Sequence, residues 1–557
     1  MQRPWLKHYP KGIAHEISFD RYDSLIDLFD ESVQKFRDRD AFVNMGTALS
    51  YEDLNYLSAD FASFLQNVAG LKRGDRVAIQ MPNLLQYPIA LFGILRAGLI
   101  VVNTNPLYTA REMKHQFRDS GAKAIVILAN SAHLLQEILP ETNIETVVVT
   151  EVGDMLGFPK SLLINSVVKY VKKMVPSYSL PKAYSFHDAL ELGSQHSFKP
   201  EKCTSEEIAF LQYTGGTTGV SKGAMLTHRN VVSNVQQMIA WIAPKLREGE
   251  ETGILALPLY HIFSLVVNGL GLFSLGATNL MITNPRDIPG FIKTLRKNRF
   301  TVFPGLNTLY NALMNHPDFD KVDWSSLKFS VAGGMALQKA VAERWMKLTQ
   351  TPLVEGYGLT ETSPVACCNP IDGTDRVGTI GLPLPSTEVA LFDDDGNPAK
   401  HGEPGEICVR GPQVMLGYWQ RPEDTAKMIT KDGWLKTGDV GVMDTDGFFK
   451  IVDRKKDMIL VSGFNVYPNE IEDVVASHPK VLEVAAVGVP DPHSTEAVKI
   501  FVVARDPSLT KEELLEHCKR NLTGYKLPRH VEFRKELPKT NVGKILRREL
   551  RDSSTKA

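Results

Sequence analysis

The sequence Tyr213-Thr-Gly-Gly-Thr-Thr-Gly-Val-Ser-Lys-Gly223 concentrates four glycines, three threonines, a serine and a lysine in eleven residues. Glycines let backbone N–H groups approach a polyanion closely, and the hydroxyl and ammonium groups add further donors. This composition predicts a loop that holds the phosphates of a nucleotide triphosphate. An ordinary turn needs one or two glycines, so a hairpin without a ligand is the weaker alternative.

The residues on either side of this loop predict strands. Residues 208–213 read Ile-Ala-Phe-Leu-Gln-Tyr, which is typical of a buried strand, and a strand pattern resumes at Gly223. A Walker A loop instead has Gly, four residues and then Gly-Lys-Ser/Thr. A phosphate loop between two strands therefore argues against a P-loop kinase or GTPase.

Length and composition limit the class of protein. A chain of 557 residues predicts more than one domain, and 63 Lys and Arg against 64 Asp and Glu give no support to nucleic-acid binding. Five cysteines without a Cys-x-x-Cys pair indicate neither a disulfide framework nor a zinc site, and they fit a reducing compartment. The N-terminus lacks the apolar segment of a signal peptide. We therefore expect a cytoplasmic protein.

Helix and strand patterns alternate through the first 450 residues, which indicates layered α/β sheets. Strands are predicted at 76–81, 124–128 and 146–150, and a helix at 84–95. Residues 253–284 carry no formal charge and imitate a membrane span. They also divide into strand 254–257, helix 262–275 and strand 278–283. We favour this buried α/β unit over a spanning helix, which needs about 20 mostly apolar residues.

The character of the chain changes at the charged run Asp453-Arg-Lys-Lys-Asp457. The residues after it predict a separate set of elements, with helices at 471–478 and 511–522 and strands at 484–489 and 498–503. Two polar stretches precede this run, Glu355-Gly-Tyr-Gly-Leu-Thr-Glu361 and Asp432-Gly-Trp-Leu-Lys-Thr-Gly-Asp439. A third, Pro538-Lys-Thr-Asn-Val-Gly-Lys544-Ile-Leu-Arg547, lies near the C-terminus.

In this order and spacing, the stretches resemble the motifs of the adenylate-forming acyl-activating enzymes. Residues 432–456 resemble the fatty acyl-CoA synthetase signature, and the resemblance to bacterial long-chain fatty acid–CoA ligases covers essentially residues 1–550. It implies an α/β fold with a large N-terminal domain (1–452) of layered sheets plus a β-barrel. A hinge (453–456) and a small, mobile α+β C-terminal domain (457–557) would follow.

The resemblance implies a two-step reaction. ATP and a long-chain fatty acid give an acyl-adenylate and pyrophosphate, and CoA then takes the acyl group and releases AMP. ATP and CoA would be co-substrates and Mg²⁺ the cofactor. A medium-chain or aryl acid–CoA ligase, or an acyl-AMP ligase serving a carrier protein, is the alternative. A lipid-binding protein without activity would not need Lys222, Glu361, Asp439 and Lys544 together.

The same resemblance implies a role for each matching residue. Glu361 would ligate Mg²⁺, Thr360 would reach the α-phosphate, and Lys544 would bridge the reacting groups during adenylation. His261 would lie over the acyl site, although a histidine among apolar residues is often a satisfied core group. The residues implied to hold ATP and CoA are Thr214, Gly215, Gly216, Thr217, Thr218, Gly219 and Lys222 (β- and γ-phosphates), Gly333, Gly334, Gly356 and Tyr357 (adenine), Asp439 and Arg454 (ribose) and Gly463 (pantetheine channel). Ser221 departs from the proline that many family members have before the loop lysine.

Residues 161–175 predict an amphipathic helix. Eight apolar side chains fall on one face, and Lys169, Lys172 and Lys173 fall opposite with Asn165. This pattern suits an interfacial helix on an anionic membrane, and packing against the enzyme's own body is an equal alternative. The oligomeric state stays open, with a homodimer among the alternatives.

Overall fold

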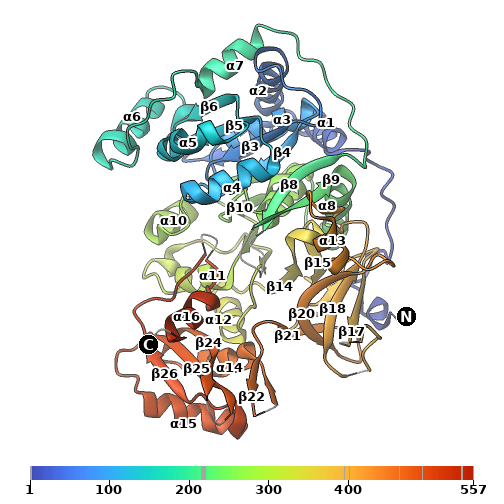
Figure 1. Ribbon diagram of the computed structural model, residues 1–557, viewed down its shortest axis with the longest axis vertical. Coiled ribbons are helices and arrows are strands. Elements are labelled where there is room, and N and C mark those ends of the chain that lie inside the picture. The colour runs from blue at the N-terminus through green and yellow to red at the C-terminus, as the bar shows by residue number, and fades with distance from the viewer. Residues whose placement is uncertain are drawn as a thin grey trace.

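The computed structural model describes residues 3–214, 221–393, 395–400, 402–462, 464–491, 494–540 and 543–555, and its architecture is α/β (Figure 1). Two large sheets form the body of the molecule. In each sheet the central strands are parallel and antiparallel strands lie at an edge. The layered α/β class expected from the sequence is confirmed.

The first sheet follows the order β7-β6-β5-β3-β4-β8-β9-β19. Its strands are β3 (Arg76–Gln80), β4 (Ile100–Asn103), β5 (Ala124–Leu128), β6 (Thr146–Thr150), β7 (Tyr184–Ser185), β8 (Ile208–Thr214), β9 (Lys222–Thr227) and β19 (Gly417–Tyr418). Strands β8 and β9 pair antiparallel, with Thr214 opposite Lys222. The glycine-rich stretch therefore connects two strands, as the sequence predicts.

The second sheet follows the order β16-β15-β14-β13-β12-β10-β11-β1-β2. Its strands are β1 (Asp40–Asn44), β2 (Thr47–Ser50), β10 (Thr252–Leu255), β11 (Thr278–Met281), β12 (Val302–Gly305), β13 (Phe329–Ala332), β14 (Leu353–Gly358), β15 (Val365–Cys368) and β16 (Leu382–Pro383). Strands β10, β12, β13 and β14 lead to the site described below.

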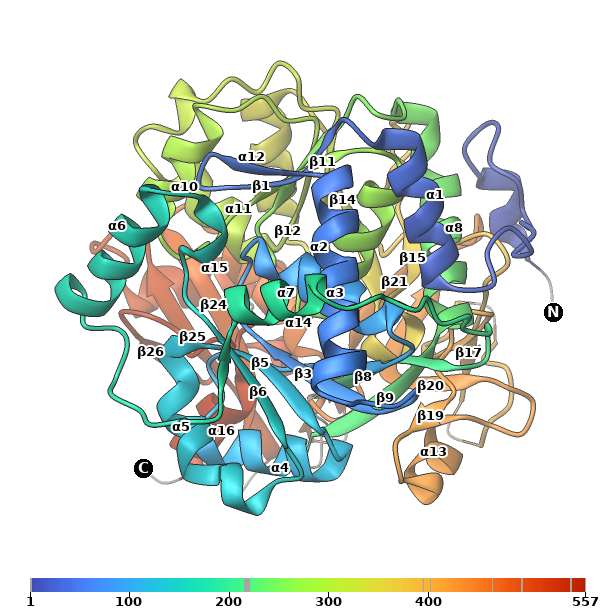
Figure 2. The same ribbon diagram turned by 90° about the horizontal axis from the view of Figure 1, so that it is seen from above.

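Helices separate the two sheets and cover their outer faces (Figure 2). The helices are α2 (Tyr51–Ser63) and α3 (Gln86–Arg96) between the sheets, α4 (Ala110–Ser120) and α5 (Ala132–Ile138) outside the first, and α10 (Ile288–Leu295), α11 (Asn307–Met314) and α12 (Lys339–Thr349) outside the second. Helix α3 is buried over nearly its whole length because both sheets contact it. Separate apolar cores on each side of each sheet hold the layers together.

Two smaller sheets follow in the last third of the chain. The first is antiparallel and contains β17 (Glu388–Phe392), β18 (Gly405–Arg410), β20 (Leu435–Met443) and β21 (Phe449–Arg454). The second contains β22 (Ile459–Val461), β23 (Phe464–Val466), β24 (Val481–Asp491), β25 (Thr495–Ala504) and β26 (His530–Phe533), with helices α14 (Pro468–Ala476), α15 (Lys511–Asn521) and α16 (Arg547–Thr555). This part has its own apolar core and lies at the opposite end of the molecule from the N-terminal helices (Figure 1).

The uncharged segment 253–284 folds as the predicted strand–helix–strand unit. Its middle differs from the expected α-helix, because α9 (Ile262–Ser264) makes one α-helical turn and η8 (Leu265–Leu272) continues as a π-helix. The first strand also ends at Leu255, two residues earlier than predicted. Among the described residues, no helix combines the length and apolarity that crossing a membrane requires.

The predicted helix 161–175 is shorter than expected. It comprises α6 (Lys160–Ser166) and a π-helical turn, η6 (Val167–Val171). Lys173 adopts a positive φ of 52°, which an α-helix does not accommodate. Asn165, predicted on the polar face with the lysines, donates a hydrogen bond to Asp154 and accepts one from the backbone N–H of Gly153.

Candidate active site

The predicted site residues gather where the parallel strands of both sheets end. Strand β13 ends just before Gly333, β14 carries Tyr357 and leads to Glu361, and β8 ends at Thr214. Strand β10 leads to His261 on the same side. The carboxyl ends of parallel strands open at one edge of a sheet, which is where α/β folds bind ligands.

These residues line one cavity of about 250 Å³. Its polar wall consists of Thr214, His261, Gly333, Gly334, Gly356, Tyr357, Thr360, Glu361, Arg454 and Lys544. The structure therefore brings most of the predicted residues together, from segments more than 300 positions apart. The remaining wall is apolar and is formed largely by Met238, Trp241, Ile242, Val267, Leu272, Val302 and Phe329.

A second cavity of about 370 Å³ adjoins the first. Lys544, Arg454, Tyr357 and the three glycines Gly334, Gly356 and Gly358 line both cavities. Asp439 lines only the second one. The two spaces thus meet at Lys544 and Arg454, so a ligand that fills both would pass these two cations.

The glycine pair at the end of β13 leaves space that a side chain would close. A Cβ atom on Gly333 would lie 3.0 Å from the ring of Phe263. Gly334 has a φ of +75°, which favours glycine. Both residues therefore allow the chain to turn beside the cavity.

Strands β20 and β21 place Asp439 opposite Arg454. The buried Asp439 carboxylate accepts a hydrogen bond of 2.7 Å from the Tyr357 hydroxyl, and its other oxygen lies 3.1 Å from Arg454 Nε. A carboxylate can accept several donors at once. This arrangement presents a fixed acceptor to the second cavity.

Glu361 and Lys222 are connected through an aromatic residue that sequence reasoning missed. The Tyr418 hydroxyl donates a 2.7 Å hydrogen bond to Glu361 Oε1, and Lys222 Nζ lies 5.4 Å from the centre of the Tyr418 ring. Lys222 also forms a 2.8 Å ion pair with Asp424. Only the pairing of β19 with β9 brings Tyr418 here, and no local pattern in the sequence signals it.

Among the groups of the first cavity whose pKa values are shifted, Lys544 and His261 are the nitrogen bases. Burial lowers the pKa of Lys544 to about 7, and the neighbouring Arg454 charge acts in the same direction. Burial also lowers the pKa of His261 to about 4, assisted by the Lys544 charge. His261 is therefore neutral at pH 7, and its Nδ1 accepts from the backbone N–H of Phe263.

Glu355 is a second residue for which no separate role was predicted from the sequence. It lines the second cavity, and burial raises its pKa to about 8. Glu355 therefore carries a proton at pH 7 and can donate as well as accept a hydrogen bond. Gly215, Gly216, Thr217, Thr218, Gly219 and Gly463, which the sequence also assigned to binding, lie outside the described residues.

The family model for AMP-binding enzymes matches residues 29–419. The model for the C-terminal domain of AMP-binding enzymes matches residues 470–544. The chain belongs to the AMP-binding enzyme family. The first match spans the sheets that carry Lys222 and Glu361, and the second ends at Lys544.

Known relatives of this AMP-binding enzyme extend over its whole length. It is 59% identical over 554 residues to the long-chain-fatty-acid–CoA ligase of Escherichia coli O157:H7, a match that covers 100% of this chain and 99% of that protein. It is 40% identical over 563 residues to the Bacillus subtilis protein of the same name, covering 100% and 98%. ATP-bound MatB from Rhodopseudomonas palustris superposes with a TM-score of 0.81 at 27% identity, covering 95% and 98%.

Proposed function

We propose that this AMP-binding enzyme activates a long-chain fatty acid with ATP, forming an acyl-adenylate and pyrophosphate, and then transfers the acyl group to CoA with release of AMP. The observation that carries this proposal is the first cavity, which joins an apolar wall to Thr360, Glu361 and Lys544. Each buried methylene of an acyl chain contributes about 0.8 kcal/mol, so an apolar pocket favours longer chains. Both curated relatives described above are named for this activity.

The adenylation half-reaction brings a carboxylate against a triphosphate, and these two anions repel. Lys544 and Arg454 supply positive charge where the two cavities meet. Asp439 would accept hydrogen bonds from the ribose hydroxyls, since its carboxylate is fixed by Tyr357 and Arg454. The adenine would lie beside Gly334 and Gly356, in the second cavity.

Lys222 would bind the β- and γ-phosphates together with the glycine-rich loop. In the structure its ammonium group pairs with Asp424, so an incoming phosphate must compete with that carboxylate. The ion pair therefore orients the Lys222 ammonium group before ATP binds.

Mg²⁺ fits the residues present. Sites for Mg²⁺ beside nucleotides use one or two carboxylates together with phosphate oxygens. Glu361 supplies one such carboxylate in the first cavity, while no cluster of three or more His, Cys, Asp or Glu side chains occurs among the described residues. When bound, Mg²⁺ would neutralise phosphate charge, and Tyr418 would keep Glu361 oriented toward it.

Transfer to CoA would follow a rotation of residues 457–557 about a hinge at 453–456. Lys544 lines the cavity in the structure, as adenylation requires. Asp453 accepts hydrogen bonds from Arg547, at 3.3 Å, and from the backbone N–H of Asn469, at 2.9 Å. These contacts join the first residue of the proposed hinge to the C-terminal domain, and we expect the rotation to break them.

Peripheral contact with an anionic membrane is part of the proposal. Helix α6 lies at the edge of the molecule in both views (Figures 1 and 2). Six large apolar side chains on this helix and its flanks are between 53% and 86% exposed: Phe158, Leu162, Leu163, Tyr170, Val171 and Met174. Lys169, Lys172 and Lys173 are exposed beside them. Apolar and basic groups together suit an interfacial helix that collects a poorly soluble acid.

Vesicle co-sedimentation tests this contact. A Lys169/Lys172/Lys173→Glu variant should bind anionic vesicles less than the wild type at low salt, because each lysine contributes about 1 kcal/mol near an anionic surface. A matched control replaces Lys511, Lys519 and Arg520, which are exposed on α15, by glutamate. Equal binding of both variants and the wild type would refute membrane contact through this helix.

The substrate class is tested by measuring CoA-thioester formation with butyrate, octanoate, palmitate and p-coumarate. We expect kcat/KM to rise with chain length and to be highest for palmitate. A maximum with p-coumarate or octanoate would favour the aryl or medium-chain alternative. Acyl-AMP release without any thioester would favour a ligase that serves a carrier protein.

A further inference from the structure

Helix α4 packs against the end of the β8–β9 hairpin, and the proposed reaction uses none of its residues. The helix is sharply terminated at both ends. Thr109 and Glu112 form a capping box at its N-terminus, and Gly121 adopts the left-handed conformation at its C-terminus. Helix α4 is therefore a fixed support beside the two strands that flank the glycine-rich loop.

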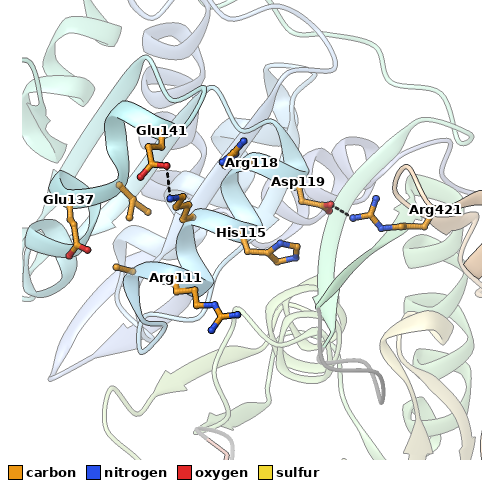
Figure 3. Close-up of a pocket in the computed structure, with 10 residues that line it drawn as sticks. Arg111, His115, Arg118, Asp119, Glu137, Glu141 and Arg421 are labelled. Atoms are coloured by element: carbon orange, nitrogen blue, oxygen red, sulfur yellow. Dashed lines mark hydrogen bonds and ion pairs between the residues drawn. The ribbon is translucent and has the colours of Figure 1, made fainter.

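Two side chains of α4, His115 and Asp119, contact residues on either side of the glycine-rich loop. Figure 3 shows both side chains on the helix, with Asp119 facing Arg421. His115 Nε2 lies 3.0 Å from the carbonyl oxygen of Ser221, which precedes β9. The Tyr213 hydroxyl, near the end of β8, donates a 2.7 Å hydrogen bond to Asp119 Oδ2. A carbonyl oxygen only accepts, so Nε2 of His115 carries the proton in this contact. Residues four apart share a helix face, which lets one helix reach both strands.

Asp119 is itself held by a segment about 300 residues further along the chain. Its second carboxylate oxygen lies 2.6 Å from Arg421, and the indole Nε1 of Trp419 donates to its backbone oxygen at 3.1 Å. The backbone N–H of Trp419 also donates to Gly223. The Asp119 side chain is only 9% exposed, so its carboxylate is oriented from several sides.

We infer that His115 and Asp119 are positioning residues: they hold Ser221 and Tyr213, which lie on either side of the glycine-rich loop, and thereby support binding of the ATP phosphates. This inference rests on the proposed function, because it assumes that the loop binds ATP. Neither residue lines the two cavities of the active site. Their effect should therefore appear only in the half-reaction that uses the β- and γ-phosphates.

The experiment separates the two half-reactions. Adenylation is measured as fatty-acid-dependent exchange between pyrophosphate and ATP, and thioester formation is measured with supplied acyl-AMP and CoA. His115→Ala and Asp119→Asn should each lower kcat/KM for ATP about tenfold, mainly through KM, as expected for one lost hydrogen bond to a fixed partner. The reaction of acyl-AMP with CoA should stay within twofold of the wild type, because acyl-AMP has neither phosphate.

Three further variants keep the test independent of folding. Tyr213→Phe removes only the hydroxyl that Asp119 accepts, and it should reproduce the Asp119→Asn effect. His115→Gln retains a donor and should recover at least half of the lost kcat/KM. Arg111→Ala, on the same helix, should have no effect on exchange, because Arg111 is exposed and has no hydrogen bond or ion pair with the described part of the chain.

Equal losses in both half-reactions would show that α4 only stabilises the fold, and an unchanged kcat/KM for ATP would show that the loop needs no support from it. Either result overturns the inference while leaving the proposed function intact. Failure of the wild type to catalyse exchange would instead overturn the proposed function, and this inference with it.

Discussion

The charge of Lys544 should control the adenylation rate near neutral pH. Burial, reinforced by the nearby Arg454 charge, lowers the pKa of this lysine to about 7. A lysine with a lowered pKa is charged below that value and neutral above it. Between pH 6 and pH 8 the charged fraction would fall about tenfold, from about 0.9 to about 0.1.

The assay is pyrophosphate–ATP exchange with palmitate, measured from pH 6 to pH 9. The profile of kcat/KM reports the free enzyme, so kcat/KM for ATP should fall about tenfold for each pH unit above 7. The bound triphosphate favours the charged lysine, so the fall in kcat should occur at higher pH. The pH profile of kcat should therefore lie at higher pH than the profile of kcat/KM.

Lys544→Arg is the matched control, because a guanidinium stays charged over this whole range. The variant should be slower than the wild type, but its profile should lack the fall above pH 7. Titration of ATP itself affects both proteins equally and cancels in the comparison. A flat wild-type profile, or a parallel fall in the arginine variant, would refute the assignment.

Three other residues give separate predictions. Asp439→Asn should lower kcat/KM for ATP by about 10- to 100-fold, because the variant loses the buried charged contact with Arg454, worth about 1.5–3 kcal/mol. An effect below threefold would contradict a ribose contact. Tyr418→Phe should raise the Mg²⁺ concentration needed for half-maximal exchange about fivefold, because Glu361 loses a hydrogen bond worth about 1 kcal/mol that orients its carboxylate. An unchanged Mg²⁺ titration would argue against Glu361 as the metal ligand oriented by Tyr418. Arg547→Gln should slow adenylation more than thioester formation, because Arg547 ties the fully buried Asp453, the first residue of the proposed hinge, to helix α16. Equal slowing of both half-reactions would count against a hinge there.

The layers of this fold could be predicted from the sequence because each element has a local signal. Strands β3, β5 and β6 are short apolar runs bounded by turns, and their observed limits match the prediction within one residue. The π-helix Leu265–Leu272 could not be predicted, because apolar content does not specify the hydrogen-bond register of a helix. Periodicity groups Asn165 with the exposed lysines of its helix, but it does not predict that Asn165 donates a hydrogen bond to Asp154.

The site itself was only partly accessible from sequence. Glycines, hydroxyls and one lysine predicted a phosphate loop on chemical grounds, but the roles of Asp439 and Lys544 came from resemblance to a family. Tyr418 and Asp424 were missed because they meet Glu361 and Lys222 only through long-range strand pairing. Shifted pKa values, such as that of Glu355, depend on burial and need the folded structure.

The central claim is that the enzyme forms an acyl-adenylate before CoA takes part. Exchange of labelled pyrophosphate into ATP, with palmitate and Mg²⁺ present and CoA absent, tests this claim most directly. We expect exchange that depends on palmitate and that Lys544→Ala abolishes, while the same variant still converts supplied palmitoyl-AMP and CoA to palmitoyl-CoA. Absence of exchange in the wild type, despite palmitoyl-CoA formation once CoA is added, would contradict an adenylate intermediate.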